Sequence, residues 1–301
     1  MQIFKQLLII IGLSLCSFTA LAKSLAFSFD DGVNPQLDPQ ANVINSSILN
    51  TLQANQLKSI IFPAIVKIGD ADGLQLVAQW GKQGHLIGNH TYSHHSLNAA
   101  TVSLNQFIED TQRAELMLKP LTGWTTRLRF PYLKEGDSVE KRDGLRHWLA
   151  AQHYQSGAVS IDASDWYYNQ KYLALLKDNE TEKIQRLKQA YIAHLLDRAS
   201  YYDQLALQTI QRSPKHMLLL HTNAINAAFL QDVIDAFKQQ QWQLIDAKTA
   251  FNDPLYQLQA NTLPAGESIL WALARQRGIQ GLRYPAEDSV YEEPLLRQLS
   301  L

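Results

Sequence analysis

Two neighbouring carboxylates end an apolar segment near the start of the chain. Asp30 and Asp31 lie in the sequence FSFDDG at positions 27–32. Adjacent carboxylates repel one another, and burying either charge without compensation is costly. We therefore expect a cation beside them. A divalent metal ion would meet this need, with one aspartate as its ligand and the other free to act as a base.

Two imidazoles follow about 60 residues later. His90 and His94 are four positions apart in the sequence HTYSH. One carboxylate and two histidines are a suitable set of three protein ligands for a catalytic zinc that keeps an open coordination position. The residues predict a metal site made by one of the two aspartates with His90 and His94, and zinc is the expected ion. The other aspartate is then left to take a proton from water.

The other conspicuous polar groups each follow a predicted strand. They occur in the sequences RFPY at 129–132, DASDW at 162–166 and LLLH at 218–221. In a β/α barrel the carboxyl ends of the strands meet at one face, where active sites are assembled. We expect these segments to meet the aspartates and histidines there.

Short apolar runs alternate with helical patterns along most of the chain, which favours right-handed crossovers and a parallel sheet. The predicted strands are Ser24–Phe29, Ser59–Phe62, His85–Gly88, Arg127–Phe130, Ala158–Ile161, Met217–Leu220 and Gln243–Ile245, and the clearest helices are Ala41–Asn55, Gln75–Gln83 and Leu104–Lys119. No glycine-rich nucleotide fingerprint follows a strand. The fold class expected is α/β, a distorted (β/α) barrel of seven or eight parallel strands.

Two stretches depart from this alternation. Residues from about 168 to 212 read as two or three amphipathic helices, a helical insertion between barrel strands. The tail from about 264 to 301 is also outside the repeat and is expected to pack over the barrel as a C-terminal extension. We assign both to a single catalytic domain, residues 23–301.

The first 22 residues have the pattern of a secretory signal peptide. Lys5 precedes an apolar run at 7–15, and Ala20-Leu21-Ala22 fits a cleavage site. A retained membrane anchor is the alternative, but the run is short for a span. Cleavage predicts an exported protein, periplasmic or secreted, without stable membrane insertion. The only cysteine, Cys16, lies in this segment, so disulfides are excluded from the mature chain.

Charge restricts the class of partner. Lys plus Arg number 27 against 28 Asp plus Glu. This balance argues against nucleic acid and anionic lipid, and favours a neutral polymer or a small molecule. The sequence does not define the oligomeric state.

Taken in order, the five polar segments resemble the motifs of the polysaccharide deacetylases, carbohydrate esterase family 4. The pattern runs from Phe29 to His221, about two thirds of the chain. Ser28 stands where the first motif more often has threonine, and both carboxylates remain. The resemblance implies that Asp31, His90 and His94 bind the metal and that Asp30 is the general base, with Arg129 keeping it ionised.

The resemblance also assigns the remaining positions. The backbone N–H of Tyr132 would help to stabilise a tetrahedral oxyanion. His221 would protonate the departing amine, with Asp165 orienting it and keeping it charged. Trp166 and Leu219 would form an apolar slot of the size of an acetyl methyl group.

This reading implies a metal-dependent hydrolase that removes N-acetyl groups from an amino-sugar polysaccharide such as peptidoglycan, poly-N-acetylglucosamine or a chitin-like polymer. The alternatives are an O-acetyl esterase on acetylated xylan-like polymers and a non-catalytic carbohydrate-binding protein on the same scaffold. An acetylated glycan is the partner in each enzymatic case. The motif residues do not separate amide from ester, because both pass through the same kind of tetrahedral intermediate.

Overall fold

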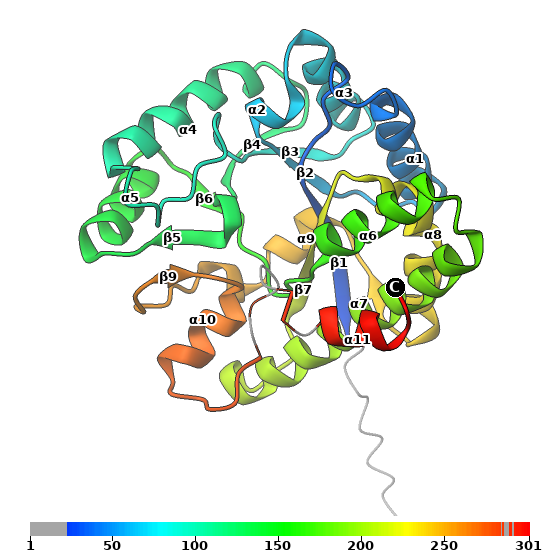
Figure 1. Ribbon diagram of the computed structural model, residues 1–301. Helices are drawn as coiled ribbons and strands as arrows, with labels where there is room; N and C mark the ends of the chain where they lie inside the picture. The colour runs from blue at the N-terminus through cyan, green and yellow to red at the C-terminus, as the bar shows by residue number, and fades with distance from the viewer. Residues whose placement is uncertain (1–22, 284, 286–288, 291) are drawn as a thin grey trace, which may run out of the picture.

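A curved parallel sheet surrounded by helices forms the body of the molecule (Figure 1). The computed structural model describes residues 23–283, 285, 289–290 and 292–301, so the predicted signal peptide at 1–22 lies outside the described residues. Within the described part of the chain, no helix has the length and apolarity needed to cross a membrane.

Seven strands make up the sheet, and all of their pairings are parallel. Its order is β6-β4-β3-β2-β1-β7, and β8 also pairs with β1. The strands are β1 (Ser24–Asp31), β2 (Ile60–Pro63), β3 (Leu86–Asn89), β4 (Trp124–Leu128), β6 (Gln155–Ser156), β7 (Lys215–His221) and β8 (Gln243–Leu244). The sheet curls into a half-barrel, which confirms the predicted distorted (β/α) barrel.

Helices connect the strands and cover the outside of the sheet. They are α1 (Ala41–Ala54), α2 (Ile65–Ile68), α3 (Ala71–Lys82), α4 (Leu104–Leu118), α5 (Val139–Ala151), α6 (Asp165–Lys177), α7 (Thr181–Ile210), α8 (Ala224–Gln239), α9 (Ala247–Phe251), α10 (Ile269–Gln276) and α11 (Glu292–Gln298). Side-chain caps fix several starts: Ser103 and Gln106 form a capping box at α4, and Asn223 accepts a backbone N–H at α8.

The predicted strand at 158–161 is reduced to one bridge, between Ile161 and Leu218. The regular strand lies earlier, at 155–156, as β6. The cause is local: the Ser160 hydroxyl accepts the Met217 N–H at 2.9 Å, which takes a donor from the ladder. The bridge still joins this segment to β7.

The long helical stretch belongs to the same core as the barrel. The stretch predicted as a helical insertion is made of α6, which begins at Asp165, and α7, which runs for 30 residues. Leu187, Tyr191 and Leu195 of α7 are fully buried in the hydrophobic cluster that also contains the sheet. In the tail, β9 (Ala265–Gly266) pairs with β5 (Lys134–Gly136), antiparallel.

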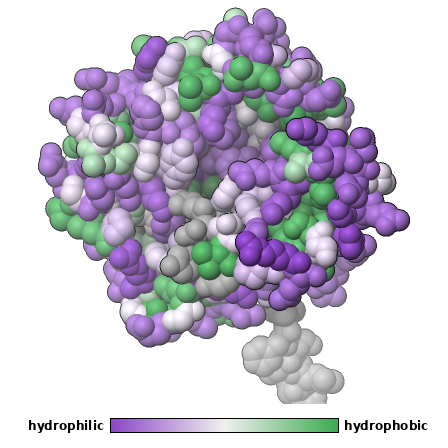
Figure 2. Space-filling model, viewed as in Figure 1, coloured by the Kyte–Doolittle hydropathy of each residue, from purple (hydrophilic) through white to green (hydrophobic). Residues whose placement is uncertain are grey.

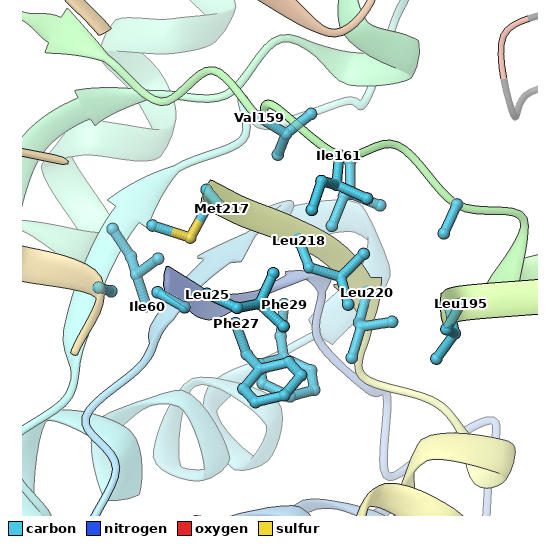
Figure 3. Packing of buried hydrophobic residues seen from close by; sticks show 14 of the residues in the cluster. Leu25, Phe27, Phe29, Ile60, Val159, Ile161, Leu195, Met217, Leu218 and Leu220 are labelled. Atoms are coloured by element: carbon cyan, nitrogen blue, oxygen red, sulfur yellow. The ribbon is translucent and has the colours of Figure 1, made fainter. Parts of the chain in front are cut away.

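The strands β1 and β7 lie at the centre of the core. Phe27 and Phe29 project from the same side of β1 among buried aliphatic side chains (Figure 3). The parallel register places Asp30 beside His221 at the carboxyl ends of the two strands. Hydrophobic burial of the strands therefore determines where these two polar side chains emerge.

Candidate active site

Asp31, His90 and His94 converge at the carboxyl end of the sheet. Their ligand atoms all lie within 4.8 Å of one another, and Asp31 Oδ1 is 3.3 Å from His94 Nε2 and 3.9 Å from His90 Nε2. Asp31 Oδ1 is buried and has no hydrogen-bond partner. Burial lowers the pKa of His94 to about 4 and that of His90 well below its usual value, so both imidazoles are neutral. A free carboxylate oxygen facing two neutral nitrogens fits a divalent cation.

The backbone around these ligands is strained. Asp31, Thr91 and His94 have φ of 74°, 66° and 55°, in the left-handed region that non-glycine residues rarely adopt. His90 is oriented through its second nitrogen, since Nδ1 donates to the Arg129 carbonyl at 2.8 Å and leaves Nε2 toward Asp31. The fold therefore maintains an unfavourable backbone geometry in order to bring the three ligand atoms together.

A helical carboxylate holds the loop between the two histidines. Asp110 of α4 accepts the backbone N–H groups of Tyr92 and Ser93 at 3.2 and 2.9 Å, and the Ser93 hydroxyl at 2.7 Å. These three bonds fix the middle of the HTYSH segment. Asp110 was not among the residues predicted from the sequence.

Asp30 is buried beside the three ligands and forms an ion pair with Arg129. The Arg129 guanidinium donates to both carboxylate oxygens at 2.9 Å, and its other nitrogens donate to the Ser28 hydroxyl and to the Gly157 carbonyl. Burial raises the pKa of Asp30 to about 6, while the charges of Arg129 and His221 act in the opposite direction. Asp30 is thus ionised at neutral pH and lies within 3.7 Å of His90 Nε2.

His221 and Asp165 form a second charged pair across the site. His221 Nδ1 donates to Asp165 Oδ1 at 2.7 Å, and the other oxygen accepts the His221 backbone N–H and the side-chain amides of Asn223 and Asn226. Burial alone would lower the pKa of His221, but the charge of Asp165 and its hydrogen bond raise it to about 10. His221 is therefore an imidazolium, able to give up a proton.

These groups line or support one cleft with a volume of about 380 Å³. The lining residues are Asp30, Asp31, Lys67, His90, His94, Tyr132, Leu133, Asp162, Ala163, Trp166, Gln170, Leu219 and His221. Arg129 and Asp165 lie behind this surface, hydrogen-bonded to Asp30 and His221. The Tyr132 ring packs edge-on against His94 with centroids 4.7 Å apart. The structure therefore brings together all the site residues predicted from the sequence.

Two polar cleft residues lie outside the motif segments that the sequence analysis singled out. Gln170 lies one turn beyond Trp166 on α6. Lys67 forms an ion pair with Asp31, with Nζ 3.3 Å from Oδ2. Lys67 follows β2 by four residues, so the rule that polar groups after strand ends meet at one face could have identified it.

A known protein family matches the part of the chain that carries most of these site residues. The model of the polysaccharide deacetylase family matches residues 19–147, which include the metal-ligand candidates, Asp30, Arg129 and Tyr132. A peptidoglycan-N-acetylglucosamine deacetylase of Bacillus cereus is 28% identical over 143 residues, 47% of this chain and 46% of that protein. The matched segment therefore spans less than half of that relative.

Two solved structures show the same fold. A CE4 esterase from Streptococcus mutans superposes with a TM-score of 0.52 at 21% identity, over 75% of this chain and 86% of its own. A CE4 family pseudoenzyme from Bacillus anthracis superposes with a TM-score of 0.51 at 14% identity, over 76% and 66% of the two chains. The chain is thus similar to the polysaccharide deacetylase family over residues 19–147, and it shares the barrel fold of these two structures.

Proposed function

We propose that the protein is a metal-dependent hydrolase that removes N-acetyl groups from an amino-sugar polysaccharide. One observation carries this proposal: ionised Asp30, paired with Arg129, lies beside the free Asp31 oxygen and two neutral imidazoles, with the His221 imidazolium in the same cleft. Amide hydrolysis requires both a base for water and an acid for the poor amine leaving group. This cleft provides one of each.

Each side chain has a defined part in the reaction. Asp31, His90 and His94 would hold a divalent metal ion, which would supply polarisation of the acetamide carbonyl. Asp30 takes a proton from the attacking water, and Arg129 keeps Asp30 ionised in its buried position. The attack on the carbonyl carbon gives a tetrahedral oxyanion.

The opposite side of the cleft completes the reaction. The Tyr132 N–H contributes to stabilising the oxyanion, and His221 donates its Nε2 proton to the departing amine while Asp165 balances the imidazolium charge. Trp166 and Leu219 exclude water from the acetyl methyl group. On the face in Figure 2, hydrophobic side chains form small separate groups among hydrophilic ones. A polar surface of this kind suits a hydroxyl-rich glycan.

The name of the Bacillus cereus relative supports an N-acetylated cell-wall glycan as substrate, and the predicted signal peptide supports action outside the cytoplasm. Two other functions use the same scaffold. One is an O-acetyl esterase, whose sugar alkoxide leaving group needs a proton less than an amine does and could accept it from the same His221 imidazolium. The other is a binding protein without catalysis; the Bacillus anthracis protein with the same fold is a CE4 family pseudoenzyme.

The test is acetate release by purified protein that has been stripped of metal and reloaded with zinc. Chitin oligomers, peptidoglycan glycan chains and acetylated xylan are the substrates. We expect zinc-dependent release from an N-acetylated glycan, and a loss in His221→Ala that is greater for amide than for activated ester substrates. Release from xylan alone would establish the esterase, and glycan binding without release would establish the binding protein.

A further inference from the structure

Lys67 is held rigidly beside the candidate metal site. The backbone N–H groups of residues 64–66 donate to the carbonyl oxygens of Asp31, Thr91 and Tyr92 at 3.2, 3.3 and 2.8 Å. Both loops that carry metal-ligand candidates are thus tied to the turn that carries Lys67. Its side chain can move, but its backbone position relative to the site is fixed.

The two oxygens of the Asp31 carboxylate face different partners. Oδ1 faces His90 and His94, whereas Oδ2 is 3.3 Å from Lys67 Nζ. The Lys67 side chain is 43% exposed and lines the cleft. A divalent ion held by Asp31, His90 and His94 would more than neutralise the Asp31 carboxylate, and it would repel the Lys67 ammonium. A flexible four-carbon stem lets it turn into the open cleft.

The other strong charges at the site have partners, including the Asp162 carboxylate of the cleft lining, which lies in the field of Arg129 and Arg198. Arg129 pairs with Asp30, and His221 pairs with Asp165. With a divalent ion on Asp31, the ammonium of Lys67 adds to an excess of positive charge on the wall that receives the acetamide. A positively charged side of the cleft attracts an anion. A lysine ammonium binds a carboxylate well when the pair is partly shielded from water.

We propose that Lys67 is a specificity-determining residue that binds a carboxylate carried by the glycan next to the acetylated sugar. The substrate class is then an acidic N-acetylated amino-sugar polymer, with lactyl-type carboxylates like those of peptidoglycan, in preference to a neutral chitin-like chain. This inference rests on the proposed function and narrows its substrate. It attributes the preference for acidic glycans to Lys67, a side chain that takes no part in the proposed proton transfers.

The experiment compares two glycans that differ only in charge. One is a tetrasaccharide of alternating N-acetylglucosamine and N-acetylmuramic acid without peptide, and the other is the same compound with its carboxylates converted to methyl amides. We expect wild type to prefer the acidic form by about 10-fold in kcat/KM, and salt at about 0.5 M to reduce the preference. Lys67→Met should abolish it, and Lys67→Arg should keep most of it.

Lys177→Met is the matched control, because it removes an exposed lysine at the far end of α6 and should leave the preference intact. Calorimetry then measures the binding of both tetrasaccharides to zinc-loaded Asp30→Asn and Asp30→Asn/Lys67→Met. These binding data distinguish a failure of the proposed deacetylase function from a failure of the role proposed for Lys67. If no acetate is released by wild type, the proposed function fails, yet binding still reports on Lys67. The role of Lys67 is overturned if proteins with and without Lys67 prefer the acidic tetrasaccharide equally. It is also overturned if neither protein prefers it.

Discussion

The two ends of β7 carry two histidine–aspartate clusters with opposite properties. At the carboxyl end, His221 opens into the cleft with Asp165 behind it. At the amino end, His216 Nε2 lies 3.2 Å from Asp203 and Nδ1 lies 3.0 Å from the Ser160 hydroxyl. The second arrangement has the composition of a serine-hydrolase triad. Yet Ser160 and His216 are fully buried and Asp203 nearly so.

Hydrogen-bond satisfaction distinguishes the two clusters. Both ring nitrogens of His216 have partners, the Asp203 oxygens also bind Ser213 and Lys23, and the Ser160 oxygen accepts a backbone N–H. The cleft instead has an orphaned oxygen on Asp31 and left-handed backbone at its ligand residues. Residue types alone therefore do not define a site. Unsatisfied buried atoms, strain and access to solvent do.

The largest contrast should come from two histidine deletions. His90→Ala removes a candidate metal ligand, so we expect loss of stoichiometric zinc and of acetate release. His216→Ala should retain zinc and keep the activity of its folded fraction, while its free energy of unfolding falls. Zinc content by atomic emission, together with urea unfolding, checks both. Full zinc in His90→Ala would remove it from the ligand set.

A smaller effect is expected where the ligand loop is held. Asp110→Asn replaces a charged acceptor of three hydrogen bonds with a neutral amide that has one acceptor oxygen, which should weaken zinc binding by about 10–100-fold. Calorimetric titration of the metal-free protein with zinc measures this affinity. Glu109→Gln is the control, since it neutralises an exposed neighbour on the same helix. Unchanged affinity in Asp110→Asn would show that the loop keeps its geometry without this carboxylate.

The buried cluster should respond to acid through Asp203. Burial would raise the pKa of Asp203, but hydrogen bonds from His216, Ser213 and Lys23 lower it to about 2. Its contribution to stability, about 2 kcal/mol, is therefore present above its ordinary pKa near 4 and lost as the pH falls toward 2. Urea unfolding of wild type and Asp203→Asn should differ at pH 6 and converge near pH 2. If the free energies of unfolding of the two proteins still differ at pH 2, this assignment is contradicted.

The smallest effect is expected for Ser160→Ala. Loss of its hydrogen bonds should cost about 1 kcal/mol of stability and leave acetate release unchanged. A fluorophosphonate probe should not label Ser160 in the native protein, because the hydroxyl is fully buried. Labelling at Ser160 would mean that the buried cluster is a second reactive site.

Much of the fold could be predicted because its pattern is local. The helix at 104–118 agrees with the expected 104–119, since an amphipathic repeat and a capping box both indicate its start. The strand expected at 158–161 was wrong in extent, because Ser160 bonds to the backbone of a residue 57 positions away. No local pattern reveals that contact.

The candidate site divides in the same way. Asp30, His90 and His221 could be predicted because each follows a strand of a parallel sheet, and those ends must meet. Asp110 could not, because its role depends on how α4 contacts the ligand loop. Lys67 also follows a strand and was overlooked. The helical stretch at 168–212 likewise gave no sign that α7 would share the barrel core.

The most direct test of the central claim is the rate of acetate release by zinc-loaded Asp30→Asn relative to wild type. If Asp30 is the base beside a metal held by Asp31, His90 and His94, the variant should bind zinc with the same stoichiometry and release acetate about 10²–10⁴-fold more slowly. Equal rates at equal zinc content would contradict the account.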